Sequence, residues 1–242
     1  MFSSVSNGII SRCWSRQFGW DEADGPLWSK PARLLPHGGD FEDYHGVMAM
    51  DALSGSVVSV PQALQSELGP ALLDSSAAPT VNATRLSPDL ISDIIGPVFI
   101  GYAEVVTGVP HHPVQLLGTK DTEHLAALEA ACDATEWDHG GSVMGEAAVM
   151  CGIFVDGTLA SLAGYEVWDS TIAHISVITH PEHRGKGYGH SAVAFLAKHA
   201  AWKKLFPQYR TLQENKPSMA IAQSLGFEFF ATSVAVRLKR GE

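Results

Sequence analysis

A short basic segment rich in glycine, Arg184-Gly185-Lys186-Gly187-Tyr188-Gly189, constrains the fold of this chain more than any other feature. Directly before it, residues 172–179 form a short β-branched run that is typical of a buried strand. After it, residues 191–203 are rich in alanine and carry apolar positions at helical spacing. Glycines let backbone N–H groups point into one concavity, and a helix N-terminus adds partial positive charge. The sequence therefore predicts a strand–loop–helix unit that holds phosphate groups.

Two other phosphate-binding motifs do not fit this segment. A P-loop needs Gly-x-x-x-x-Gly-Lys-Ser/Thr, whereas Lys186 lies between two glycines. A dinucleotide fingerprint needs Gly-x-Gly-x-x-Gly, whereas the spacing here is Gly-x-Gly-x-Gly. The pattern that remains is Arg-x-x-Gly-x-Gly, and its alternative interpretation is a plain strand-to-helix turn.

A second segment, which begins at residue 209, has the predicted order strand, helix, strand. Residues 209–212 indicate a short strand, and Asn215 precedes a helix that ends at Leu225-Gly226-Phe227, before a last strand. Together with the Arg-x-x-Gly-x-Gly loop, this order resembles the GCN5-related N-acetyltransferase (GNAT) superfamily over roughly residues 119–240. The resemblance implies an α/β (α+β) fold. Its central sheet would be mixed, mostly antiparallel, and splayed at an acetyl-CoA site.

The chain is predicted to divide into two halves. With 242 residues and 45% hydrophobic composition, it can bury one large core or two modest ones. Residues 1–115 are interpreted as an N-terminal α/β half that acts as a lid or as support on the substrate side. Residues 116–242 are interpreted as the GNAT acetyltransferase domain.

In the N-terminal half, a β-hairpin is expected between residues 45–50 and 56–60, with Ser54-Gly55 at the turn. Pro61 is expected to open a short helix to Leu68, and Ser87-Pro88 to start a helix that runs to about Ile95. The remaining expectations are a loop over 74–80, a strand over 97–105 and a connector over 109–113.

In the second half, the first expected element is a helix over 121–132, with an apolar face at Leu125, Leu128 and Ala131. Residues 136–141 are too polar and too rich in glycine to predict an element. Strands follow over 149–155 and 159–167, and Asp156-Gly157 between them is a strong hairpin signal.

The resemblance assigns the contacts of acetyl-CoA residue by residue. In this superfamily acetyl-CoA lies between two splayed strands, and an amine attacks the thioester directly. Backbone groups of Val177, Ile178 and Thr179 would follow the pantetheine arm, and one N–H could polarise the thioester carbonyl. The pyrophosphate would be held by Arg184, Gly185, Lys186, Gly187, Tyr188 and Gly189, and the pantetheine or sulfur side by Asn215 and Ser218.

The chain departs from the family pattern at both proton-transfer positions. Many relatives carry a general-base Glu where Ala173 stands and an acidic Tyr where Ala222 stands. A base within reach of the amine is still expected. His174 is a candidate by residue type, although strand alternation places it opposite Ala173, so a core histidine is the alternative. The other candidates are Glu166 or Asp169 acting through water, ordered water alone, and Ser218 or Tyr209 as the acid.

The formal net charge of −10 is the compositional clue to the acceptor. It disfavours nucleic acid, which needs a basic surface, and it favours a cationic ligand, unless the acidity serves solubility alone. Carboxylates and aromatic rings attract ammonium groups, and two clusters supply both. The first is Trp20, Asp21 and Glu22 with Asp24 and Trp28; the second is Glu136, Trp137 and Asp138, joined by Glu166 and Trp168. The alternative for each cluster is a solvated acidic loop that a tryptophan anchors to the core.

Over its full length the chain resembles a less common GNAT branch in which a non-catalytic N-terminal half comes first. The resemblance lies in Glu136-Trp137, residues 173–181 and residues 208–212. Some members are similar to aminoglycoside 2'-N-acetyltransferases that inactivate kasugamycin. The implied activity is acetyl transfer to a primary amine of a small cationic substrate, an aminoglycoside such as kasugamycin, with antibiotic resistance as the role. Peptide or protein amines, other small amines and a non-catalytic acyl-CoA sensor stay open as alternatives.

The remaining features predict a cytoplasmic protein without a metal. Cys13, Cys132 and Cys151 are odd in number and lack close spacing, which indicates reduced thiols. No apolar run is long enough to cross a membrane, and the N-terminus has no signal-peptide pattern. The 11 histidines include no tetrahedral set with carboxylate or thiol partners. The sequence leaves the oligomeric state open, with a homodimer as one option.

Overall fold

The computed structural model describes residues 2–140 and 149–240. It divides the chain into two compact units. Unit 1 comprises Met1–Ile100, Thr211–Lys216 and Phe229–Glu242, and unit 2 comprises Gly101–Arg210 and Pro217–Glu228. In the described residues, no helix combines the length and the apolar character that a membrane crossing requires.

Unit 1 contains a five-stranded part of the fold in the order β1-β3-β2-β10-β4. β1 is parallel to β3, whereas β2 is antiparallel to both β3 and β10. Valines of β2, β3 and β10 form one core with leucines of α2. The elements are α1 (Ser4–Gln17), β1 (Arg33–Pro36), β2 (Gly46–Ala52), β3 (Gly55–Val60), α2 (Gln65–Leu72), α3 (Pro79–Thr84), β4 (Ile91–Tyr102) and β10 (Glu228–Leu238), with short 3-10 turns at Glu22–Asp24, Gly39–Phe41 and Gln62–Leu64.

The hairpin predicted around Ser54-Gly55 is confirmed, although its turn is Leu53-Ser54 and Gly55 already belongs to β3. The helix predicted from Ser87-Pro88 to Ile95 is wrong. Residues from Ile91 onward belong to β4. The β-branched side chains in this stretch suit a pleated strand, and this preference outweighs the capping signal at Ser87. Two helices had no counterpart in the prediction, namely α1 and α3. In α1 the buried Ile10, Cys13 and Trp14 follow helical spacing.

Unit 2 contains the strands β9-β8-β7-β6-β5 in that order. Neighbouring strands are antiparallel except for β8 and β9, which are parallel. The predicted hairpin is confirmed, because Asp156 and Gly157 have φ values of 50° and 82°, as a tight two-residue turn requires. The strands are β5 (Gln115–Leu116), β6 (Val149–Val155), β7 (Thr158–Trp168), β8 (Ile172–Thr179) and β9 (Phe206–Leu212).

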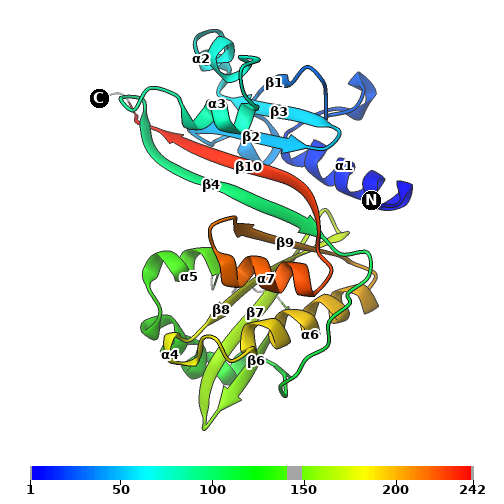
Figure 1. The fold of residues 1–242 in the computed structure, drawn as a ribbon, viewed down its shortest axis with the longest axis vertical. Coiled ribbons are helices and arrows are strands. Elements are labelled where there is room, and N and C mark those ends of the chain that lie inside the picture. Colours follow the sequence, from blue (N-terminus) through cyan, green and yellow to red (C-terminus); the bar gives the residue numbers. More distant parts are fainter. Residues whose placement is uncertain (1, 141–148, 241–242) are drawn as a thin grey trace. The chain divides into compact units, whose positions relative to one another are not determined.

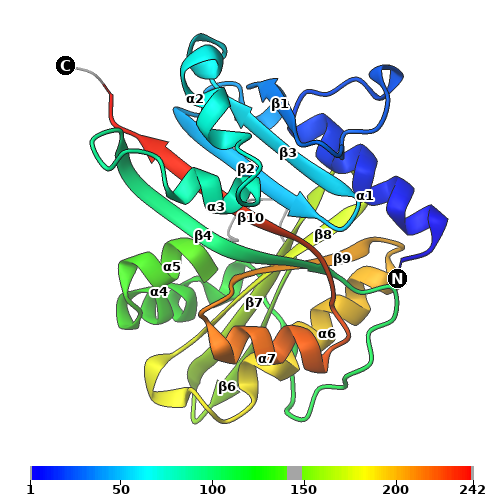
Figure 2. The same ribbon diagram turned by 45° about the horizontal axis from the view of Figure 1, so that its top comes forward.

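Helices cover both faces of this sheet (Figures 1 and 2). On one face, Trp137 of α5 packs in one core with Leu162 and Ile178 of the strands. On the other face, the Tyr165 hydroxyl meets His199 of α6 at 3.1 Å. The helices are α4 (Thr122–Ala131), α5 (Ala134–Gly140), α6 (Tyr188–Trp202) and α7 (Lys216–Ser224), with 3-10 turns at Thr119–Asp121 and Pro181–His183.

Two predictions about helices in unit 2 need correction. Helix α6 begins at Tyr188, three residues before the predicted start, because its cap Gly187 is left-handed with φ 81°. The expectation of an irregular segment over 136–141 is wrong for residues 136–140, which belong to α5. Asp133 caps this helix by accepting from the N–H groups of Thr135 (2.9 Å) and Glu136 (3.3 Å). Gly141 lies outside the described residues.

The parallel strands β8 and β9 separate partway along their length. Their paired register runs from Ile172–Phe206 to Ile175–Tyr209. Beyond these pairs β8 continues to Thr179 and β9 to Leu212. The backbone of 176–179 therefore extends past its pairing with β9, in the segment predicted to contact pantetheine.

Candidate functional site

The Gly-rich loop connects the end of β8 to the first turn of α6. Gly185 and Gly187 have φ values of 75° and 81°, in the left-handed region that favours glycine. Among the described residues, a Cβ atom on Gly185 would have no heavy atom within 4 Å, and one on Gly187 would meet the His112 ring from 3.5 Å. The backbone at these two glycines is therefore uncrowded, directly before the N-terminus of a 15-residue helix.

Close packing fixes the first turn of α6 against the end of β8. A Cβ atom on Gly189 would approach Thr179 Oγ1 to 3.1 Å. The same Thr179 hydroxyl lies 3.0 Å from the Ser161 hydroxyl on β7. The absence of a side chain at Gly189 thus sets how closely the helix N-terminus approaches the strand.

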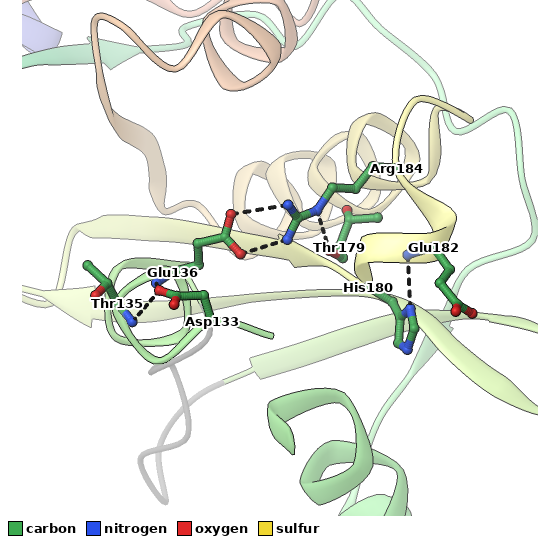
Figure 3. Close-up of polar contacts among 7 residues, drawn as sticks. All are labelled: Asp133, Thr135, Glu136, Thr179, His180, Glu182 and Arg184. Carbon is green, nitrogen blue, oxygen red and sulfur yellow. Dashed lines mark hydrogen bonds and ion pairs between the residues drawn. The ribbon is translucent and has the colours of Figure 1, made fainter. Parts of the chain in front are cut away.

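The side chain of Arg184 makes three hydrogen bonds at the rim of the loop (Figure 3). Its Nε donates to the Thr179 carbonyl at 3.2 Å. Its Nη1 and Nη2 donate to the two carboxylate oxygens of Glu136, at 3.1 and 2.7 Å. Two residues that were predicted for different ligands, the pyrophosphate and the amine, are therefore ion-paired with each other.

Histidines surround the loop, a feature that the sequence analysis did not use. His112 Nε2 donates to the Lys186 carbonyl at 2.9 Å, so this nitrogen carries the ring proton. The Tyr188 ring lies between those of His112 (4.6 Å) and His183 (6.2 Å). The Lys186 ammonium donates to the Glu182 carbonyl at 3.1 Å. The adjacent pair His111-His112 is visible in the sequence, but its contact with the loop is not.

Glu166, Trp168 and His174 lie on one face of the sheet in unit 2. Glu166 is directly opposite His174 in the antiparallel register of β7 and β8, which places such Cβ atoms about 5 Å apart. The Trp168 ring stacks on the His174 ring at 4.1 Å, and the guanidinium of Arg210 lies over the same indole at 5.8 Å. The structure thus brings together three of the predicted site residues.

A buried amide orients His174. Gln208 is 0% exposed; its Nε2 donates to the Tyr102 hydroxyl, and its Oε1 lies 2.9 Å from His174 Nδ1. Because an amide oxygen only accepts, the imidazole carries its proton on Nδ1, and Nε2 keeps the lone pair. Alternation along residues 206–212 could have shown that Gln208 and Arg210 share a face, but only with the strand pairing known.

The imidazole of His174 is held neutral. Burial lowers its pKa to about 3, and the positive charge of Arg210 acts in the same direction. A group with this pKa accepts hydrogen bonds but does not retain a proton near neutral pH.

His174 is expected to make folding stability depend on pH. Its pKa in the folded protein, about 3, lies below the ordinary value of 6.5, so the unfolded chain binds the proton more readily. Its contribution is therefore complete above pH 6.5 and is lost as the pH falls toward 3. The free energy of unfolding, measured by urea denaturation at about pH 7 and about pH 5, should fall less in His174→Gln than in the wild type. A pH dependence in His174→Gln equal to that of the wild type would refute this prediction.

The candidates for the acid form a hydrogen-bonded pair. The Tyr209 hydroxyl lies 2.7 Å from Ser218 Oγ, and Tyr209 is 1% exposed. Burial raises the pKa of Tyr209 to about 12, although the hydrogen bond to Ser218 opposes this shift. Ser218 is half-buried and lies one helical turn before Ala222 on α7. Ala222 and Ala173 are both 0% exposed and serve as core residues.

The other candidates for ligand binding have defined neighbours within their own units. Trp20 in unit 1 carries the Arg33 guanidinium over its ring at 4.2 Å, and Asp21 accepts from the Ala23 N–H at 2.9 Å. Trp28 packs edge-on against Phe230. Asn215 precedes α7, and its N–H donates to the Leu212 carbonyl at 3.0 Å. Substrate roles for Trp20, Asp21, Glu22, Glu136, Trp137, Asp138, Glu166 and Trp168, and cofactor roles for Asn215 and Ser218, stay predictions.

The three cysteines are free, as predicted, and Cys13 and Cys151 are buried. Burial raises the pKa of Cys151 to about 12, which keeps this thiol protonated and unreactive. Among the residues that the structure describes, no three His, Cys, Asp or Glu side chains are grouped so that they could hold a metal ion.

Comparisons with known proteins agree with this geometry. Residues 151–234 match the family model described as GNAT acetyltransferase. The fold is similar to that of a protein described as a GNAT-family acetyltransferase from Novosphingobium aromaticivorans, with TM-score 0.50, 22% identity and coverage of 64% of this chain and 69% of that one. A GNAT-family acetyltransferase from Colwellia psychrerythraea gives TM-score 0.51 and 17% identity over 77% of each chain. No curated protein sequence matches the chain. Residues 151–234 thus match a GNAT acetyltransferase model, and the two solved structures show a similar fold.

Proposed function

We propose that this protein transfers the acetyl group of acetyl-CoA to a primary amine of a small cationic molecule. The observation that carries the proposal is the uncrowded loop at Gly185 and Gly187, which joins the separating end of β8 to the N-terminus of α6. Unpaired N–H groups at a helix N-terminus, together with Arg184 and Lys186, suit a diphosphate. GNAT enzymes take acetyl-CoA, which carries such a diphosphate.

In the proposed reaction, the amine nitrogen bonds to the acetyl carbon while the carbon–sulfur bond breaks. The amine loses a proton, and the departing sulfur gains one. We assign the acceptance of the amine proton to Glu166, directly or through water, because neutral His174 is too weak a base to retain it. His174 Nε2 would accept a hydrogen bond from the amine. This bond would orient the lone pair of the amine nitrogen toward the acetyl carbon. An N–H of residues 177–179 would stabilise the oxygen of the acetyl group.

We further propose an aminoglycoside, with kasugamycin as the first candidate, as the acceptor, and antibiotic inactivation as the role. The net charge of −10 supports a cationic acceptor. The carboxylate of Glu166 and the ring of Trp168 lie on the same sheet face and suit an ammonium group. These features support a polyamine as well, so the choice among amines depends on the assay.

The test is thiol release from acetyl-CoA by the purified protein with a panel of acceptors. The panel contains aminoglycosides including kasugamycin, polyamines and short peptides. Rapid turnover with one amino sugar supports the full proposal. Turnover on peptides alone supports acetyl transfer but refutes the aminoglycoside. Acetyl-CoA binding without turnover on any amine refutes the enzyme and indicates an acyl-CoA sensor.

The hydroxyl pair of Tyr209 and Ser218 is proposed to supply the proton to sulfur. Tyr209→Phe keeps the ring packing against Phe227 but removes the hydroxyl, so kcat should fall about tenfold, below the usual range for direct acid catalysis, because Tyr209 acts through Ser218. The matched control is Tyr165→Phe, which removes a buried hydroxyl that bonds to His199 instead. The fall in kcat of Tyr209→Phe should be smaller with a thioester whose thiol is more acidic, because that sulfur can leave without gaining a proton. Equal losses in both variants, unaffected by the leaving group, would assign Tyr209 to packing alone.

A further inference from the structure

A carboxylate is ion-paired with the arginine of the Gly-rich loop. Glu136 meets the two terminal nitrogens of Arg184 with one oxygen each, at 3.1 and 2.7 Å (Figure 3). Arginine recognises carboxylate and phosphate oxygens by the same parallel pair of N–H donors. Glu136 therefore holds the position at Arg184 that a phosphate group would take.

We propose that Glu136 is a built-in competitor for the phosphate loop, and that CoA binds by displacing its carboxylate from Arg184. This inference rests on the proposed function, since the displacing group is the diphosphate of CoA. It makes Glu136 a residue that sets the affinity of the loop for anions, in place of the amine-binding role predicted from the sequence.

The backbone position of Glu136 is fixed by its helix. The next residue, Trp137, is 7% exposed and packs with Leu128 of α4 and Ile178 of β8. At the end of α5, a Cβ atom on Gly140 would come within 2.6 Å of the Val177 carbonyl, so the helix packs tightly on β8. A carboxylate held in this way is present at the loop whenever α5 is folded.

The ion pair itself is exposed enough to be exchanged. The side chains of Arg184 and Glu136 are 46% and 48% exposed, and exposed pairs are weak because water solvates both partners. Among the side-chain hydrogen bonds of Arg184 to described residues, the Nε bond to the Thr179 carbonyl is the one that does not involve Glu136. A ligand that also bonds to N–H groups at the start of α6 gains contacts that Glu136 cannot supply.

Displacement of Glu136 sets one threshold for every anion that needs Arg184. The free energy lost with the ion pair is the same for a lone phosphate and for a diphosphate, so Glu136 weakens both by one factor. A lone phosphate gains little beyond the contact that it replaces, whereas a diphosphate that also spans Gly187 and the first turn of α6 gains enough to release the carboxylate.

The chain offers a matched control for the charge of Glu136. Glu182 lies two residues before Arg184, and its backbone N–H donates to His180 Nδ1 (3.3 Å; Figure 3). Among the described residues its carboxylate forms no ion pair. Glu182→Gln therefore removes the same charge near the loop without removing a contact to Arg184.

The test is calorimetric titration of the purified full-length protein with CoA. Glu136→Gln should bind CoA about three- to fivefold more tightly than the wild type, the range expected for an exposed ion pair. Glu182→Gln should change the affinity less than about 1.5-fold, because salt screens a charge that makes no contact. In an Arg184→Gln background, Glu136→Gln should give no gain beyond that of Glu182→Gln. Inorganic phosphate should gain from Glu136→Gln by the same factor as CoA, because both ligands displace the same carboxylate.

The possible failures are distinguishable. An equal gain from Glu136→Gln and Glu182→Gln, or a gain that persists without Arg184, overturns the exchange but leaves the CoA site intact. An absence of CoA binding by the wild type and by every variant overturns the proposed function and the exchange with it. Thermal unfolding of each variant in parallel verifies that the proteins compared are folded.

Discussion

Gly187→Trp is expected to reduce the affinity for acetyl-CoA by about 100-fold or more, equivalent to about 2.7 kcal/mol or more. Gly187 caps α6 in the left-handed conformation, and among the described residues its Cβ position meets the His112 ring from 3.5 Å. An indole would fill the space next to the N–H groups at the start of the helix. Calorimetric titration with acetyl-CoA measures the loss directly.

A control is needed for the backbone strain that any side chain causes at this position. Gly157 in the β6–β7 turn has φ 82°, close to that of Gly187, and also has open space at its Cβ position. Gly157→Trp should therefore cause similar strain but leave acetyl-CoA affinity unchanged. Unchanged affinity in a folded Gly187→Trp protein would mean that the loop does not hold the phosphates.

Glu166→Gln is expected to lower kcat by about 100-fold, the scale of general base catalysis. The carboxamide keeps the size of the side chain opposite His174 but cannot accept the amine proton. Acetyl-CoA affinity should stay at the wild-type value, because Glu166 lies on β7 and makes no contact with the Arg184 loop among the described residues. The measurement is kcat, with acetyl-CoA affinity determined in parallel, between about pH 6 and about pH 9.

The pH profile of kcat in Glu166→Gln is compared with that in His174→Gln. With a pKa of about 3, His174 does not titrate in this range, so its replacement should lower kcat without changing the shape of the pH profile. A Glu166→Gln protein with full turnover throughout the range would remove Glu166 from the mechanism and leave ordered water as the base.

Local signals predicted the elements around the loop well. The β-branched run 172–179 has the bounds of β8, and Asp156-Gly157 forms the expected turn. These signals depend on neighbours in sequence, so they can be seen in one chain. The Ser87-Pro88 helix was wrong because its capping signal is also local, whereas strand formation in β4 depends on a partner far away in the sequence.

The candidate site, like the fold, was predictable where it depends on neighbours in sequence and not where it depends on distant residues. Glycine spacing predicted a turn between a strand and a helix, which the structure has between β8 and α6, whereas phosphate binding by its residues stays a prediction. The ion pair between Arg184 and Glu136 joins residues 48 positions apart, and no periodicity links them. Gln208 was visible as a polar residue, but its role depends on its 2.9 Å contact with His174 on another strand. Contacts of this kind require the register, which a single sequence does not contain.

The position of β10 has a consequence for how the protein is made. β10 is the last strand of the chain, yet it pairs with β2 from Ala231–Ala52 to Arg237–Gly46, and its Val234 and Val236 complete the core of unit 1. A ribosome that has released residues 1–100 has therefore delivered β2 with one edge still open. That edge stays open until β10 has been synthesised. The core of unit 1 thus depends on a segment translated long after β2, and in between the unpaired edge of β2 is exposed to aggregation and to chaperones.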